Sequence, residues 1–146
     1  MSIYKSTIQI KASKQMVFKT ISEIKNFSKA IPDIVDIDIL TDTEKGVGTR
    51  FRETRLIMGK KTSTILEITE YEANNHVRIV SNSSGTTWDS NYRLKENNDI
   101  INLTLEMEAI PHTIFARITN IFIKGMLQRA LDKDMKSVKK YYEKEK

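Results

Sequence analysis

The chain has 146 residues, of which 39% are hydrophobic and 29% charged, and its formal net charge is +5 at pH 7. This size and balance are typical of one folded domain over residues 1–146, and they exclude a disordered or membrane-embedded chain. The absence of cysteine excludes disulfides, thiolate metal sites and cysteine nucleophiles. The first residues alternate polar and apolar side chains without the apolar core of a signal peptide, so we expect a cytoplasmic protein.

The predicted elements begin with one strand and two short helices. Residues 3–12 alternate, and Tyr4, Ser6, Ile8 and Ile10 share one face of the strand. Ser13 is expected to cap a helix that begins directly after it. The string "NFSKAIPDI" predicts a second short helix or turn that ends before its proline, because the residue before proline is pushed out of helical geometry.

Six further segments alternate and are expected to form antiparallel strands. The first, "DIVDIDIL", presents Val35, Ile37 and Ile39 as its apolar face. The others are "TRFRETRLIM", "TSTILEITEYE", "VRIVS", "TTWDSNYRL" and "IINLTLEM", with turns at 42–48, 59–61, 74–75, 82–85 and 96–99. Strands that follow one another through short turns predict a seven-stranded antiparallel sheet with one packed face.

After Pro111 the apolar period changes from two to about 3.6 residues, which indicates a helix over residues 113–142. Its stripe is Ile114, Ile118, Ile121, Phe122, Met126, Ala130, Leu131, Met135, Val138 and Tyr142. The long helix is the obvious cover for the packed face of the sheet, so we predict an α+β fold. A curved sheet around one helix tends to leave space between them, where ligands bind.

The glycines at 46 and 48 do not form a phosphate-binding loop. Phe51 stands where the third glycine of a dinucleotide fingerprint would be, and a strand follows instead of a helix. Both glycines are therefore interpreted as turn residues that adopt positive φ. His76 and His112 are far apart in the sequence and are expected to be surface or capping residues, so no metal and no cofactor is predicted. The basic residues lack a recognition-helix pattern, so we expect no nucleic-acid partner.

The candidate acid–base residues are Glu53 and Arg55, which share a strand face with Phe51. The same strand could instead turn Arg50, Arg52, Thr54 and Leu56 inward. If Glu53 and Arg55 face an apolar cavity, they either satisfy each other or orient a ligand. Neither role of the pair is sufficient to assign a catalytic residue.

Aromatic and aliphatic side chains from several elements are expected to line the cavity. The full set is Phe51, Trp88, Tyr92, Leu103, Leu105, Phe115, Ile118, Phe122 and Met126. Before Gly125, the string "HTIFARITNIFIK" is apolar on nearly all sides, which is more than one buried stripe requires. The surplus would face a ligand, a membrane during delivery or a partner chain. We expect this segment to line the pocket or its mouth and to move more than residues 131–142.

The element order and several strings resemble the START-like (SRPBCC) superfamily, in particular its polyketide cyclase/dehydrase and lipid-transport branch. The strings are "ISEIKNFSKAIPDIVDIDIL", "GVGTRFRETRLIMGK", "LEITEYEANNHVRI", "WDSNYRL" and "LDKDMKSVKKYYE". The resemblance covers essentially the whole chain. It implies a helix-grip fold, in which a curved seven-stranded antiparallel sheet grips the C-terminal helix around a deep apolar cavity. Members bind lipids, sterols, quinones or polyketides, and a minority catalyse cyclisation or dehydration.

Three hypotheses of function follow. The first is a non-enzymatic binder or carrier of a small hydrophobic molecule. The second is an enzyme of the cyclase/dehydrase type, in which Glu53, Arg55, Trp88 and Tyr92 orient a polyketide-like substrate. This hypothesis loses its best residue if Glu53 lies on the solvated face of the sheet. The third is a protein-interaction module, as in START-like co-chaperones, which a large exposed apolar patch would favour. The oligomeric state and the identity of the ligand do not follow from the sequence.

Overall fold

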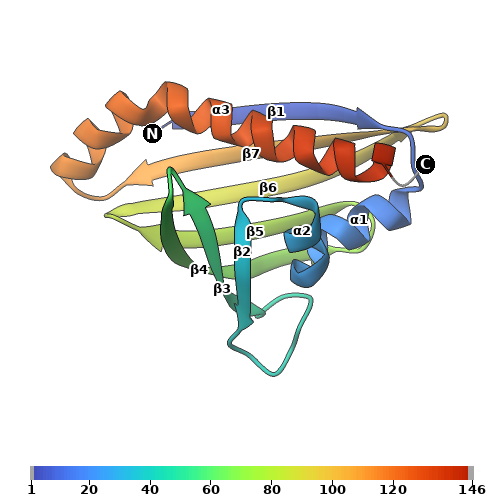
Figure 1. Cartoon of the computed structure of the whole chain (residues 1–146), viewed down its shortest axis with the longest axis horizontal. Helices are drawn as coiled ribbons and strands as arrows, with labels where there is room; N and C mark the ends of the chain where they lie inside the picture. The colour runs from blue at the N-terminus through green and yellow to red at the C-terminus, as the bar shows by residue number, and fades with distance from the viewer. Residues whose placement is uncertain (1, 145–146) are drawn as a thin grey trace.

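A computed structural model describes residues 2–144, which form seven strands and three helices (Figure 1). In chain order the elements are β1 (Ser2–Ile10), α1 (Lys14–Ser22), α2 (Ile24–Ala30), β2 (Ile34–Ile39), β3 (Arg50–Ile57), β4 (Lys60–Glu72), β5 (His76–Ser83), β6 (Thr86–Asn97), β7 (Ile100–Pro111) and α3 (Ile114–Lys144). The predicted element order and the long C-terminal helix are confirmed.

The seven strands form one antiparallel sheet in the order β1-β7-β6-β5-β4-β3-β2. The sheet is curved, and α3 lies along the side of β1 and β7 while α1 and α2 lie at the opposite side of the concave face (Figure 1). The main hydrophobic core lies between sheet and helices, with side chains such as Tyr4, Ile68, Leu103 and Met135 almost fully buried. Since α3 packs mainly on β1 and β7, the middle strands are not covered by it directly.

Local signals explain where the helices and turns begin. The Ser13 hydroxyl accepts a hydrogen bond of 3.2 Å from the Met16 amide, which confirms the predicted cap of α1. The Thr113 hydroxyl accepts one of 3.0 Å from the Ala116 amide at the start of α3. Gly46 and Gly48 have φ of 85° and 94°, in the region that glycine adopts without steric cost, so their assignment as turn residues is also confirmed.

Two sequence predictions were wrong in detail. Val35 is exposed, because a register shift between Ile34 and Asp36 turns Ile34 inward instead; Ile37 and Ile39 remain partly buried. His76 is buried, since it is the first residue of β5 rather than part of the preceding turn.

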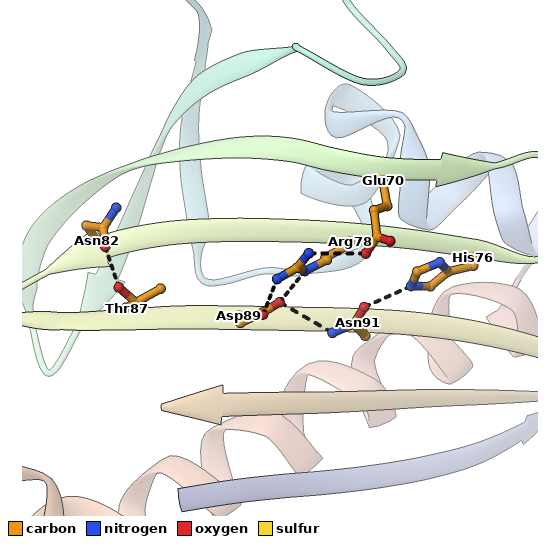
Figure 2. A network of polar contacts seen from close by, with 7 residues as sticks. All are labelled: Glu70, His76, Arg78, Asn82, Thr87, Asp89 and Asn91. Atoms are coloured by element: carbon orange, nitrogen blue, oxygen red, sulfur yellow. Dashed lines mark hydrogen bonds and ion pairs between the residues drawn. The ribbon is translucent and has the colours of Figure 1, made fainter. Parts of the chain in front are cut away.

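The convex face of the sheet carries a polar network that ties β4, β5 and β6 together (Figure 2). Arg78 donates to both carboxylate oxygens of Asp89, at 2.8 Å from Nε and 2.6 Å from Nη2, and to Glu70 at 3.3 Å. Asn91 joins Asp89 to His76, whose Nε2 lies 2.8 Å from the Asn91 amide oxygen. Hydrogen bonds from Arg78 hold the pKa of Asp89 below its usual range, although partial burial opposes this. Each charged side chain of the network has a partner within it, so we interpret the network as a structural cross-link.

We expect Asp89→Asn to lower the free energy of unfolding by about 1 to 2 kcal/mol at pH 7, because a charge-assisted bidentate pair is lost. A carboxylate whose folded-state pKa is lowered stabilises the fold above its ordinary pKa of 3.8 and loses that contribution as pH falls through the folded-state value. The difference between the two proteins should therefore shrink below about pH 4 in urea titrations. Asp38→Asn is the matched control, because Asp38 pairs with Arg52 at 3.1 Å while both side chains stay exposed. Equal losses for the two variants, or a difference that is independent of pH, would contradict this interpretation.

Candidate functional site

A cavity of about 360 Å³ lies between the concave face of the sheet, α2 and the middle of α3. Its lining comes from Ile21, Ile24, Phe27, Phe51, Glu53, Arg55, Ile57, Thr64, Leu66, Ile79, Ser81, Ser83, Trp88, Ser90, Tyr92, Leu105, Met107, Leu127, Ala130, Leu131 and Asp134. Aliphatic and aromatic side chains predominate, with a few hydroxyls and one charged cluster among them. Pockets of this kind bind small molecules that are mostly apolar.

A larger depression of about 740 Å³ lies outside this cavity, between α2 and the outer side of α3. Its walls include Lys29, Arg129, Lys133, Lys136 and Lys140. Charged walls that remain in water cannot bury an apolar molecule favourably. The smaller inner cavity is therefore the candidate site.

The orientation of β3 decides which of its side chains reach the cavity. Phe51, Glu53 and Arg55 point inward and line it, whereas Arg52 points away and pairs with Asp38 on the neighbouring strand. Phe51 is buried in the core, which fixes the phase of the alternation. Glu53 thus lies on the cavity side of the sheet.

The charged cluster joins the sheet to the helix. The Arg55 Nε donates to the Glu53 carboxylate on the same strand, and its Nη1 lies 3.0 Å from Oδ1 and within salt-bridge distance of Oδ2 of Asp134 on α3. The exposed fractions of the three side chains are small, at 23%, 11% and 17% for Arg55, Glu53 and Asp134. Buried charges are tolerated when they are paired in this way, because each compensates the desolvation of the other.

Burial and charge together set the protonation of this cluster. Burial alone lowers the pKa of the Arg55 guanidinium, but the charges of Glu53 and Asp134 outweigh it and the pKa rises. Burial raises the pKa of Asp134, an effect that Arg55 partly offsets. Burial, reinforced by the charge of Asp134, also raises the pKa of the Tyr92 phenol, so this hydroxyl stays protonated. With two carboxyl groups and one guanidinium, the cluster opposes the entry of a further anion.

Six of the sequence-predicted site residues line the cavity: Phe51, Glu53, Arg55, Trp88, Tyr92 and Leu105. Leu103 is fully buried in the core and lies outside this lining. Phe115, Ile118, Phe122 and Met126 are exposed and do not belong to this lining. The physical reason is the rotation of α3, whose first half turns Ala116 and Asn120 toward the sheet; Asn120 donates to Thr86 at 3.1 Å.

Sequence reasoning missed Asp134 and the contribution of the two short helices. A signal for Asp134 was present, because it falls within the apolar stripe formed by Leu131, Met135 and Val138. An acidic side chain inside such a stripe needs a buried partner. No comparable signal marks Phe27, whose ring packs edge-on against Tyr92 at a centroid distance of 6.0 Å.

Neither a metal-binding cluster nor a membrane-spanning helix is found within residues 2–144. No group of His, Cys, Asp or Glu side chains in this part of the chain is arranged to hold a metal ion. Within the same residues, no helix combines the length and the apolar character needed to cross a membrane.

Comparison with known proteins adds the family. Residues 1–143 match the family described as "Polyketide cyclase / dehydrase and lipid transport". No curated protein matches the sequence significantly.

Solved structures agree on the fold. A START superfamily protein from Mycobacterium smegmatis superposes with a TM-score of 0.80 at 13% identity, over 99% of each chain. A protein from Thermus thermophilus gives 0.77 at 15% identity, over 95% of each chain. One half of the di-domain ARO/CYC StfQ of the steffimycin biosynthetic pathway gives 0.78 at 8% identity, covering 98% of this chain and 51% of that one. At these identities the likeness shows the fold alone, whereas the match over residues 1–143 shows that the chain belongs to the polyketide cyclase/dehydrase and lipid transport family.

Proposed function

We propose that the protein binds and carries a small, mostly apolar molecule that has an uncharged polar end. The observation that carries this proposal is the inner cavity of about 360 Å³ with its apolar walls. Its volume falls within the range of about 300 to 1,000 Å³ that is usual for small-molecule pockets. Apolar walls that already face each other across a space gain from a guest of matching size, because water in the cavity returns to bulk.

The charged cluster favours an uncharged polar end over a carboxylate. A fatty-acid carboxylate would have to compete with Glu53 and Asp134 for the single guanidinium of Arg55. An alcohol, phenol or ketone avoids this repulsion. The Tyr92 hydroxyl lines the same space and stays protonated, and the hydroxyls of Ser81 and Ser90 also line it. Such a ligand would place its polar atom near these groups and its apolar part against Trp88 and Leu105.

A cyclase/dehydrase activity is the second candidate, since Glu53 faces the cavity as that hypothesis requires. Its carboxylate is held by Arg55, which lessens its availability as a base. Mass spectrometry of a polyketide-like ligand incubated with the protein distinguishes the two functions. Loss of one water from the ligand supports catalysis, and recovery of the intact ligand supports carriage.

Binding can be tested with a neutral fluorescent apolar probe such as Nile red. We expect saturable binding, competition by a long-chain alcohol, and a loss of affinity of at least about tenfold in Ser90→Phe, because the added ring occupies the cavity. Ile65→Phe adds the same kind of bulk on the opposite face of the sheet and is the matched control, since Ile65 is exposed. Thermal unfolding establishes that both variants fold. Unchanged affinity in folded Ser90→Phe would show that the probe binds elsewhere.

Selectivity for the polar end is tested by Asp134→Asn. Removal of one carboxylate charge should raise the affinity for a fatty acid, relative to the alcohol of equal length, by about tenfold, because a charge–charge repulsion is lost in a partly dry site. Asp132→Asn also removes one carboxylate charge from the same helix, but Asp132 does not line the cavity, so this variant should leave the ratio unchanged. Equal ratios in all three proteins would contradict the proposed role of the cluster.

A further inference from the structure

The outer face of α3 is divided into an apolar half and a basic half. Its first half exposes Ile114, Phe115, Ile118, Ile121, Phe122 and Met126, and the side chains of Phe115 and Phe122 are 79% and 83% exposed. Its second half exposes Arg129, Lys133, Lys136 and Lys140, which line the large outer depression together with Lys29. Phe115, Ile118, Phe122, Met126, Arg129, Lys133, Lys136 and Lys140 follow one another at intervals of three and four residues. They therefore lie along one face of the helix.

A second exposed apolar element is the tip of the β3–β4 hairpin. Met58 is 91% exposed at this tip, and Leu56 and Ile57 beside it are also exposed. The hairpin reaches toward α3 from the opposite side of the sheet (Figure 1), and Ile57 shares the lining of the inner cavity with Leu127 and Ala130 of α3. The hairpin tip and the middle of α3 thus stand on two sides of the same cavity.

The two chain segments that carry these apolar residues contain basic but no acidic side chains. No Asp or Glu occurs from Ala109 to Leu131 or from Thr54 to Leu66, although the chain contains 19 acidic residues. Arg117, Lys124, Lys60 and Lys61 are the exposed basic residues of these segments beside Arg129. On the basic half, Lys133 pairs with Asp33 at 2.9 Å, whereas no ion pair is found for Lys136 or Lys140 within residues 2–144. This distribution is complementary to a surface that is apolar inside and anionic outside.

We propose that the outer face of α3 and the tip of the β3–β4 hairpin dock on an anionic phospholipid bilayer. The apolar half of α3 and Met58 enter the boundary between headgroups and acyl chains, as an interfacial amphipathic helix does. Arg129, Lys136 and Lys140 contact lipid phosphates at the surface, where each basic residue adds to the attraction.

A protein partner fits these observations less well. The apolar side chains project from a helix and from a separate hairpin tip, so they do not form the single apolar core with a polar rim that is usual in protein interfaces. A planar anionic bilayer needs no matching shape. It accepts protruding apolar side chains, and its negative charge attracts the basic side chains beside them.

The test is co-sedimentation of the ligand-free protein with vesicles of phosphatidylcholine and with vesicles of an equimolar mixture of phosphatidylcholine and phosphatidylglycerol. We expect binding to the anionic vesicles that weakens as sodium chloride is raised. Phe115→Ser combined with Phe122→Ser should weaken it by at least about tenfold, because two large apolar side chains leave the boundary. Lys136→Gln combined with Lys140→Gln should also weaken it by about tenfold or more.

Each double variant has a matched control. Ile3→Ser combined with Val47→Ser removes two exposed apolar side chains elsewhere, and Lys45→Gln combined with Lys95→Gln removes the same charge elsewhere. The controls should bind like the unmodified protein. None of the eight positions lines the inner cavity, so Nile red binding by all four variants should be unchanged. The vesicle assay uses ligand-free protein, so it tests the docking surface separately from the proposed function.

Three results would overturn the proposal. One is the absence of binding to anionic vesicles at low salt. Another is an equal loss in the variants and their controls. The third is a dimer, detected by analytical ultracentrifugation, that Phe115→Ser with Phe122→Ser dissociates, because the apolar face would then be an interface between two copies of the chain.

Discussion

The ion pair between Arg55 and Asp134 is the contact on which the cavity depends. It connects a strand in the outer part of the sheet to a helix that packs mainly on β1 and β7 at the other side. The Arg55 guanidinium pairs with the carboxylates of Glu53 and Asp134 across the cavity. Apolar side chains cannot pack tightly around these charged groups without a further desolvation cost. Apolar side chains in the same positions would favour collapse of the sheet onto the helix. In this account the charged cluster holds the helix at a distance and also makes one wall of the cavity polar.

The two halves of α3 differ in how they contact the rest of the protein. The second half buries Leu131, Met135 and Val138 in the core and extends Asp134 to the sheet. The first half touches the rest of the protein mainly through small or polar residues, including Ala116, which lies close to Gly85 at the β5–β6 turn. Few apolar contacts hold this half in place, so we expect local opening there to cost less free energy than opening of the second half. Gly125 lies between the two halves and weakens the helix further, by about 1 kcal/mol relative to alanine.

Much of the fold could be predicted because its periodicity is regular. Alternation fixed the strands, and the change of period after Pro111 located the helix to within about two residues, which is the usual uncertainty at helix ends. The phase of β2 was missed because a bulge moves the apolar face from Val35 to Ile34, and a bulge leaves no mark in a pattern of single residues.

The site was harder to predict because it depends on tertiary packing. Trp88, Tyr92 and Leu105 could be placed from strand alternation alone. The inward face of β3 could not, since both of its faces carry charged residues, and the buried position of Phe51 decides it. Phe115 and Phe122 look like core residues in sequence, because hydrophobicity favours burial; the structure exposes them, since α3 presents only one side of its first half to the sheet.

We propose that an apolar molecule with an uncharged polar end occupies the inner cavity and not the apolar outer face of α3. Intermolecular nuclear Overhauser effects between a long-chain alcohol and isotopically labelled protein measure this contact directly. We expect effects from the alkyl chain to the Leu105 and Leu127 methyls and to Met107, all of which line the cavity. Effects confined to Ile118 and Ile121 on the outer face, with none to the cavity methyls, would contradict it.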